Sequence, residues 1–190
     1  MDTKSIMIVG VGGQGTLLAS KLLGAALIKK GYDVKVSEVH GMSQRGGSVV
    51  TYVKYGDKVY SPIVQKGEAD LLLSFEQLEA ARWLEHLKVG GTLITNTQKI
   101  DPMPVIIGTE TYPENVLEEI NKSGANVISL DALSLAVEAG SPKAVNVVLI
   151  GVLAKKTDIS YEDWIDALKC TVPGKFLELN LKAFDLGYNY

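Results

Sequence analysis

The stretch SIMIVGVGGQGTLLASKLLGAALIKKG, from Ser5 to Gly31, decides the fold of this 190-residue chain. It opens with the apolar run Ser5–Val9, which is typical of a strand buried on both faces. The glycine-rich segment Gly10–Gly15 follows, and then leucines, alanines and Ile28 recur at the spacing of one wide helical face. Strand, glycine turn and helix in this order predict the first unit of a doubly wound α/β fold.

The chain departs from that plan after the second predicted strand. Asp33–Val39 alternates apolar and polar residues, and we expect it to pair in parallel with the first strand because such crossovers are local and right-handed. A second crossover helix should follow, but His40–Gly47 is a polar loop with three glycines. Ser48–Val64 then holds two β-rich runs joined around Gly56 and Asp57, which predicts an inserted antiparallel hairpin.

The rest of the chain continues the alternation of strands and helices. We predict strands at Ala69–Phe75, Thr92–Thr97, Val105–Gly108 and Asn126–Ala132, and helices at Glu76–Gly91, Pro113–Ser123, Leu133–Ala139, Lys143–Lys155 and Tyr161–Leu168, with one more near the end of the chain. No change of composition marks a boundary, so we predict a single domain over residues 1–190. The expected architecture is α/β, a Rossmann-like three-layer fold whose sheet is mostly parallel with an inserted antiparallel hairpin.

The composition excludes several classes of function. Hydrophobic residues make up 46% of the chain and charged residues 22%, which is ordinary for a globular protein. A net charge of −3 argues against a broad nucleic-acid surface. No apolar run reaches the ~18 residues that a membrane span needs, and MDTKSIMIVG lacks the pattern of a secretory signal. We therefore expect a cytoplasmic protein with no nucleic-acid partner and no membrane partner.

Metal chemistry has few ligands available in this sequence. Cys170 is the only cysteine, whereas an iron-sulfur cluster takes about four thiolates. His40 and His86 are the only histidines and lie far apart in the sequence. We therefore expect no metal site and no iron-sulfur cluster on this chain.

The first glycine-rich segment is a candidate anion site. Gly10, Gly12 and Gly15 match the G-x-G-x-x-G pattern, in which glycines bring backbone N–H groups close to a phosphate at a helix N-terminus. Glu38, at the end of the second strand, is placed to hold a ribose hydroxyl, so one hypothesis is a dehydrogenase that binds NAD or a flavin. The alternative is that these glycines only allow tight packing between strand and helix.

The loop His40–Gly47 is the second candidate site. The Arg45 guanidinium, among hydroxyl and amide donors and glycines, suits recognition of a phosphate or a carboxylate, although a surface ion pair is the ordinary alternative. His40 is either a general base or a packed, hydrogen-bonded ring. Both loops follow strands of the same direction, so we expect them to lie on the same rim of the sheet.

Other polar and aromatic residues are weaker candidates. Asp70, Glu76 and Glu79 could act as paired carboxylates, but the last two are most simply read as the solvated face or first turn of a helix. Trp83 and Trp164, at helical positions, are read as core or interface anchors. We expect Cys170, in a helical context, to be inert.

Six segments together identify a family resemblance. GVGGQGTLLASKLLG, EVHGMSQRGGSVV, SFEQLEAARWL, GGTLITNT, AVNVVLIGVLA and KFLELNLKAF resemble the gamma-type subunit of 2-oxoacid:ferredoxin oxidoreductases over nearly the whole chain. Within that family, HGMSQRGGSV is most similar to the small (beta) subunit of indolepyruvate ferredoxin oxidoreductases.

The resemblance implies a division of labour between subunits. A 2-oxoacid such as indolepyruvate is decarboxylated on thiamine diphosphate, electrons leave through iron-sulfur clusters to ferredoxin, and the acyl group passes to coenzyme A. This chain has no Gly-Asp-Gly thiamine diphosphate signature and only one cysteine. A larger partner subunit must therefore carry thiamine diphosphate and the clusters, this chain binds no cofactor alone, and coenzyme A is a co-substrate.

By this resemblance the two glycine loops complete the active site or the coenzyme A site, and with the residues singled out above they give the site candidates. Arg45 and His40 are the catalytic candidates. The binding candidates are Gly10, Gly12, Gly13, Gln14, Gly15, Thr16, Glu38, Ser43, Gln44, Gly46 and Gly47. Three hypotheses remain open from the sequence: a subunit of such an oxidoreductase, a free-standing nucleotide-binding protein, and a non-catalytic scaffold.

Overall fold

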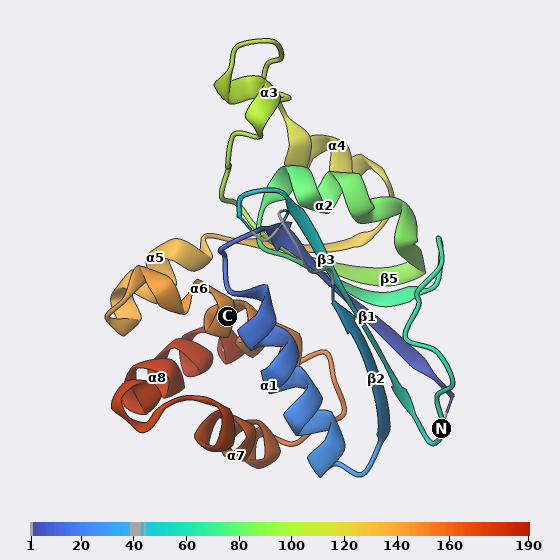
Figure 1. Ribbon diagram of the computed structural model, residues 1–190, viewed down its shortest axis with the longest axis vertical. Coiled ribbons are helices and arrows are strands. Elements are labelled where there is room, and N and C mark those ends of the chain that lie inside the picture. The colour runs from blue at the N-terminus through green and yellow to red at the C-terminus, as the bar shows by residue number, and fades with distance from the viewer. Residues whose placement is uncertain (1, 39–42, 44) are drawn as a thin grey trace.

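A single six-stranded sheet organises the protein (Figure 1). The computed structural model describes residues 2–38, 43 and 45–190. The strands run in the order β2-β3-β1-β4-β5-β6. Their bounds are β1 Lys4–Val11, β2 Asp33–Glu38, β3 Ser48–Gly56, β4 Ala69–Ser74, β5 Leu87–Asn96 and β6 Asn126–Leu130.

Helices cover both faces of the sheet, which confirms the predicted three-layer α/β architecture (Figure 1). Ile6 and Ile8 of β1 pack into the core that contains α1, α6, α7 and α8, whereas Met7 and Val9 face the smaller core with α2 and α4. The α-helices are α1 Thr16–Lys29, α2 Gln77–Trp83, α3 Met103–Ile106, α4 Val116–Lys122, α5 Ala132–Ala139, α6 Val145–Ala154, α7 Tyr161–Thr171 and α8 Leu177–Tyr188. Short 3-10 helices span Leu84–His86, Pro142–Ala144 and Gly174–Phe176.

The strand next to β1 is not the one that the sequence suggested. β3 lies between β2 and β1 and runs antiparallel to both, with Val9 opposite Val50 and Val36 opposite Val53. On its other side β1 pairs in parallel with β4. The expected departure from the Rossmann plan is therefore seen in the strand order: the strand that follows β2 in the chain is its antiparallel neighbour β3, and not a parallel strand reached by a crossover.

The hairpin predicted around Gly56 and Asp57 is wrong. β3 ends at Gly56, and both of its edges are already paired, so no edge is open for a second arm. The following segment is tied down in an irregular conformation instead: Val59 N donates to Asp33 Oδ2 at 2.9 Å. The Val59 and Val64 side chains are buried.

Two other boundaries differ from the sequence prediction. The helix expected over Glu76–Gly91 ends at Trp83 and a 3-10 helix, because β5 already begins at Leu87, opposite Ala69 of β4. The pairing register between β4 and β5 then shifts between Ala69 and Leu71. Gly90, in the irregular part of β5, has a left-handed backbone with φ 78°. No strand forms at Val105–Gly108: Val105 and Ile106 belong to α3, and Ile107 and Gly108 form the turn that follows it. The Pro102 carbonyl starts this helical turn by accepting from Val105 N and Ile106 N.

α6 is the central helix of the larger core, and all ten of its residues are buried. It crosses α8 at two glycines. A Cβ atom on Gly151 would lie 2.3 Å from Phe184 O, and one on Gly187 would lie 1.9 Å from Val148 O. The two backbones therefore touch, and this contact holds the N-terminus of α6 at the rim of the sheet.

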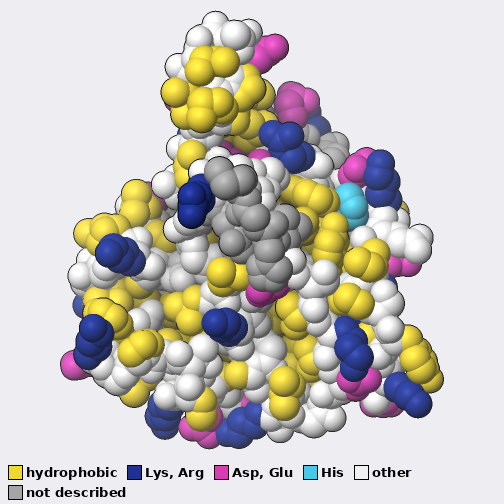
Figure 2. Space-filling view, viewed as in Figure 1, with side chains coloured by type: hydrophobic (Ala, Val, Ile, Leu, Met, Phe, Trp, Pro, Cys, Tyr) yellow, Lys and Arg dark blue, Asp and Glu magenta, His cyan; other side chains and the backbone are white. Residues whose placement is uncertain are grey.

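Residues 99–113, called the arm below, project from the body between β5 and α4 and carry α3 near the tip (Figure 1). Hydrophobic side chains gather on this projection (Figure 2). Met103, Ile106 and Ile107 expose 65%, 66% and 64% of their surface. The described residues include no helix long and apolar enough to span a membrane.

Candidate functional site

The first glycine loop is a tight turn between β1 and α1. β1 runs on through Gly10 and Val11, and the turn itself reaches left-handed backbone at Gly13, φ 100°, and Gly15, φ 86°. Gly15 precedes α1, and a Cβ there would lie 2.5 Å from Asn146 Nδ2 at the start of α6. Only glycine satisfies both the conformation and the close approach of α6 at this position.

The Gln14 side chain folds back and braces the turn. Its Oε1 accepts from Val11 N at 2.7 Å. Its Nε2 donates to Phe75 O at 3.1 Å and to Gln98 Oε1 at 3.3 Å. Gln14 therefore ties the ends of β1, β4 and β5 together, and its amide is used in holding the turn.

The turn leaves backbone donors free at the N-terminus of α1. Within the described part of the chain, no acceptor is found for the N–H groups of Gly13, Gly15, Thr16 and Leu17. Unpaired N–H groups at a helix N-terminus carry a partial positive charge, and they favour an anion. The predicted phosphate-binding geometry is therefore present as far as the backbone is concerned.

A hollow of about 440 Å³, called the turn hollow below, opens beside these donors. Gly13 and Gly15 line one side of it, and Gln98, Lys143 and Asn146 line the other. Lys143 is exposed and makes no ion pair with any carboxylate among the described residues. Lys143 was not a candidate from the sequence, because it lies far along the chain from the glycines and belongs to no motif.

The second glycine loop lies against the first. Gly12 N donates to Gly47 O at 2.8 Å, and Gly47 N donates to Ser43 O at 2.9 Å. The two loops therefore share one rim of the sheet, as predicted. Arg45 and Gly46 are exposed. His40 and Gln44, the other predicted residues of this loop, lie outside the described residues.

Glu38 contacts the side of α1. Its Oε1 accepts from the Ser20 hydroxyl, one turn into the helix. Because β3 separates β2 from β1, Glu38 ends a strand that is not the neighbour of the glycine turn. A Rossmann dinucleotide spans adjacent strands, so this arrangement does not favour the NAD or flavin hypothesis.

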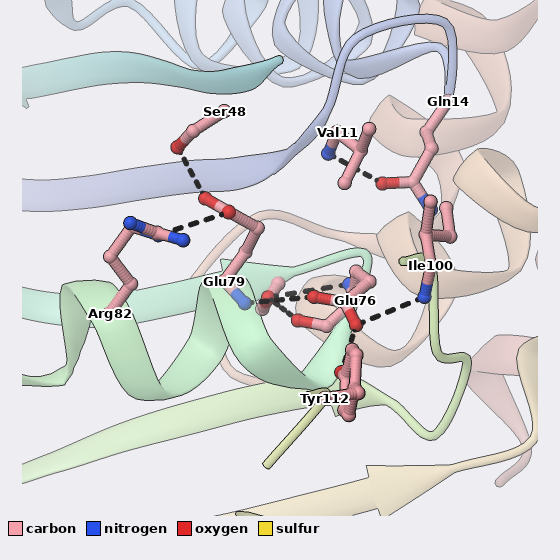
Figure 3. A network of polar contacts seen from close by, with 9 residues as sticks. Val11, Gln14, Ser48, Glu76, Glu79, Arg82, Ile100 and Tyr112 are labelled. Carbon is pink, nitrogen blue, oxygen red and sulfur yellow. Dashed lines mark hydrogen bonds and ion pairs between the residues drawn. The ribbon is translucent and has the colours of Figure 1, made fainter. Parts of the chain in front are cut away.

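Glu76 and Glu79 are buried, at 1% and 4% exposure, so the solvated part of the sequence reading was wrong, whereas their place at the start of a helix is confirmed: Glu76 is the N-cap of α2 and Glu79 lies in its first turn. Glu76 caps α2: its Oε2 accepts from Glu79 N at 2.9 Å. Its Oε1 accepts from Ile100 N at 3.3 Å and from the Tyr112 hydroxyl (Figure 3). Burial, and then the hydrogen bond to Glu76, raises the pKa of Tyr112 above its ordinary value.

Glu79 joins the same network to the second glycine loop (Figure 3). It accepts from the Ser48 hydroxyl at the start of β3, and its Oε1 lies 3.2 Å from Arg82 Nε. Asp70, the third carboxylate candidate, lies at the other end of β4, where it accepts from Ser5 N at 2.7 Å and pairs with Lys88. Glu76 and Glu79 thus anchor the arm and the second loop to α2.

The remaining candidates are placed plainly by the structure. Trp164 is fully buried and packs against Phe184, with ring centroids 6.1 Å apart, so the core reading is confirmed. Trp83 is partly buried beside His86, 5.1 Å between ring centroids. Cys170 is exposed on α7.

Comparison with known proteins decides the family. The model for pyruvate ferredoxin/flavodoxin oxidoreductase matches residues 5–190. The chain belongs to this family. An indolepyruvate oxidoreductase subunit IorB of Pyrococcus horikoshii is 47% identical over 98% of this chain and 95% of its own length.

Two relatives from one organism differ in how similar they are to this chain. In Thermococcus kodakarensis, indolepyruvate oxidoreductase subunit IorB is 45% identical to this chain, over 98% of this chain and 95% of the relative. The pyruvate/ketoisovalerate oxidoreductases common subunit gamma of the same organism is 29% identical, over 95% and 92%. The chain is therefore more similar to the first subunit than to the second.

Solved structures share the fold. The gamma subunit of keto/oxoacid ferredoxin oxidoreductase from Geobacter sulfurreducens is 26% identical, with a TM-score of 0.73 over 98% of this chain and 96% of that one. The 2-oxoglutarate:ferredoxin oxidoreductase from Magnetococcus marinus, solved with 2-oxoglutarate, coenzyme A and succinyl-CoA bound, is 20% identical with a TM-score of 0.77. It matches all of this chain but only 31% of its own, so there the fold is one part of a longer chain.

Proposed function

We propose that this chain is the small subunit of a 2-oxoacid ferredoxin oxidoreductase that acts on aryl pyruvates such as indolepyruvate. The observation that carries the proposal is the contrast in one organism, 45% identity to an indolepyruvate oxidoreductase subunit against 29% to a pyruvate/ketoisovalerate gamma subunit. The Pyrococcus horikoshii relative, at 47% over nearly the whole of both chains, agrees with it.

The redox chemistry belongs to a larger subunit in this proposal. Thiamine diphosphate and iron-sulfur clusters reside there, and ferredoxin takes the electrons from the complex. Cys170 is this chain's only cysteine and lies exposed on α7, so the chain has too few thiolates for a cluster. Its contribution is to bind and orient a co-substrate at the interface with that subunit.

The turn hollow is the part of this chain that fits coenzyme A. The free N–H groups of Gly13, Gly15 and Thr16 and the unpaired ammonium of Lys143 are donors suited to a phosphate group. We assign to them the binding of a coenzyme A phosphate. Arg45, on the adjoining second loop, would hold either the carboxylate of the 2-oxoacid or a second phosphate.

Reconstitution of the complex tests the proposal. The chain would be co-expressed anaerobically with its larger subunit, and reduction of viologen or ferredoxin would be followed with indolepyruvate, phenylpyruvate and pyruvate. We expect activity that requires this chain and that favours the aryl substrates. Equal activity without the chain would refute the subunit role, and a preference for pyruvate would refute the substrate assignment.

Arg45→Ala tests the second loop in the same assay, with Lys175→Ala as the matched control, because Lys175 is an exposed cation at the start of the 3-10 helix before α8. We expect turnover or the KM of one substrate to change by about tenfold or more, as for loss of a charge-assisted hydrogen bond. Kinetics indistinguishable from the control would remove Arg45 from the site.

A further inference from the structure

The arm presents apolar side chains to solvent on a preformed tip. No residue of α3 is buried, and Met103, Ile106 and Ile107 each expose about two thirds of their surface. Single exposed apolar residues are ordinary, but several on one projection mark an interaction site. Here they gather on the part of the protein farthest from its body (Figure 2).

The tip holds its own shape without the body of the protein. Pro102 O accepts from Val105 N and Ile106 N, at 2.9 and 3.1 Å. Pro104 O accepts from Thr109 N at 2.9 Å, from Glu110 N at 3.1 Å and from the Thr109 hydroxyl at 3.0 Å. A surface that is already ordered loses little conformational entropy when a partner binds.

The base of the arm is fixed to the body by the buried Glu76. Glu76 Oε1 accepts hydrogen bonds from Ile100 N and from the Tyr112 hydroxyl, so both ends of the arm are bonded to the same atom (Figure 3). Lys99 also lies over the Tyr112 ring, 5.6 Å from its centroid. The arm therefore projects in a defined direction.

A groove of about 560 Å³, the arm groove, is lined by the arm, by α2 and by residues 46–48 at the start of β3. Leu78, Ile100 and Val105 give it an apolar lining. Its described lining carries four carboxylates, Glu76, Glu79, Asp101 and Glu110, against one arginine, Arg82. Asp101 and Glu110 are exposed, and no cation pairs with either in the described part of the chain.

We infer that the arm and the arm groove are the docking surface for the larger subunit, and that the groove takes an apolar segment of that subunit bearing an arginine or lysine. In the groove, the apolar part of that segment lies along Ile100 and Val105, and its cation meets Asp101 and Glu110. Ile106 and Ile107, exposed at the tip of the arm, contact the larger subunit outside the groove. This inference rests on the proposed function. The charge argues against a second copy of this chain as occupant, because two acidic grooves repel each other.

The first test is the double variant Ile106→Asp with Ile107→Asp, titrated against the purified larger subunit by analytical ultracentrifugation. Both side chains are exposed, so the variant should fold, which circular dichroism checks. We expect Kd to rise by about 100-fold or more, as for loss of interface anchors. The matched control is Val89→Asp, since Val89 is fully exposed at the opposite end of β5, and its Kd should stay within about twofold of the wild-type value.

The second test reverses the charge of the groove with Asp101→Lys and Glu110→Lys. We expect weaker association and a smaller dependence of Kd on salt, since a favourable charge pair is lost. Glu162→Lys with Glu178→Lys changes the net charge equally on α7 and α8, at exposed positions, and should leave Kd unchanged.

The outcomes separate this inference from the proposed function. If wild-type subunits associate and both arm variants bind as tightly as their controls, the docking surface is wrong and the subunit role stands. If the wild-type chain neither associates nor affects viologen reduction, the proposed function fails and the inference with it. If the aspartate variants alter only self-association of the isolated chain, the occupant is a second copy and the inference is overturned.

Discussion

The backbone N–H of Gly12 donates a hydrogen bond of 2.8 Å to the carbonyl oxygen of Gly47, and this bond joins the two glycine loops. It also occupies the Gly12 N–H, so the donors left for an anion are those of Gly13 and the residues at the start of α1. The first loop therefore faces the turn hollow, and the second loop faces the arm groove.

The loop contact makes a prediction for Gly47→Ala. A Cβ at Gly47 would lie 2.9 Å from the Ser43 Cα, a backbone atom that cannot yield without moving the loop. We expect amide exchange of Gly12, measured by NMR, to become about tenfold faster because its acceptor shifts. Gly67→Ala is the control: its φ is 76°, and nothing lies within 4 Å of the added Cβ. Unchanged exchange at Gly12 in Gly47→Ala would contradict the model of a coupled pair of loops.

Lys143→Ala tests the turn hollow. If Lys143 meets a phosphate of coenzyme A, its loss should raise the KM for coenzyme A about tenfold, or about 1.4 kcal/mol, while the KM for the 2-oxoacid stays the same. Lys175→Ala again serves as a control on an exposed cation. A rise in the KM of the 2-oxoacid alone would place the substrate, not coenzyme A, in the hollow.

The crossing of α6 and α8 predicts a large effect from a single methyl group. Gly151→Ala or Gly187→Ala would drive Cβ into backbone atoms at 2.3 or 1.9 Å, so we expect each to lower the free energy of unfolding by about 3 kcal/mol or more. Gly24→Ala, inside α1 with nothing within 4 Å of its Cβ, should raise it by about 0.5–1 kcal/mol. Urea unfolding followed by circular dichroism measures all three, and equal effects would refute the close crossing.

Alkaline stability should depend on Tyr161. Its hydroxyl donates to Asp185 Oδ1 at 2.5 Å, and this hydrogen bond is the main cause that raises the pKa of Tyr161 to about 12. A raised pKa in the folded state stabilises the protein fully below the ordinary tyrosine pKa of 10, and that stability is lost as the pH rises through 12. Tyr161→Phe should therefore be less stable than the wild type at pH 8, and the difference should vanish towards pH 12.

Tyr188→Phe is the control, at pH 8, for removing a hydroxyl group from the same ring cluster. Tyr188 lies in the same ring cluster, 5.2 Å from Tyr161 between ring centroids, and within the described residues its hydroxyl has no carboxylate acceptor. At pH 8 we therefore expect Tyr188→Phe to lower the free energy of unfolding by less than Tyr161→Phe does. A constant difference for Tyr161→Phe between pH 8 and pH 12 would contradict the prediction, because it would show that the hydrogen bond from the Tyr161 hydroxyl to Asp185 does not cause the effect on stability.

Elements with a strong local pattern were predictable from the sequence. The buried runs of β1 and β4, the partly exposed strand β6 and the helices α1, α7 and α8 lie where the sequence pattern placed them. The glycine turn also has the backbone donors that its motif predicts. The strand predicted at Val105–Gly108 was wrong. β-Branched residues favour a strand only where a sheet offers an open edge, and here Pro102 and Pro104 start a helical turn instead.

Features that depend on distant segments were not predictable. The position of β3 beside β1 depends on which strand β3 pairs with, and the local sequence of β3 does not determine that partner. The sequence allows Glu76 to be read as a helix cap, because it is polar and precedes a helix. Its burial could not be predicted, because it depends on Tyr112 at the far end of the arm, whose hydroxyl donates to Glu76. Lys143 lines the turn hollow because it lies in the 3-10 helix that leads into α6, whose residue Asn146 packs against Gly15.

The turn from β2 straight back into β3 also bears on the order of folding. These strands are joined by residues 39–47 alone, whereas β1 must wait for residues 12–68 before it meets β4. Closing a short loop costs less entropy than closing a long one. We therefore expect β2 and β3 to pair first, and β1 then to pair with the free edge of β3. The antiparallel part of the sheet, which departs from the Rossmann fold, would in this way form before the parallel part, β1-β4-β5-β6.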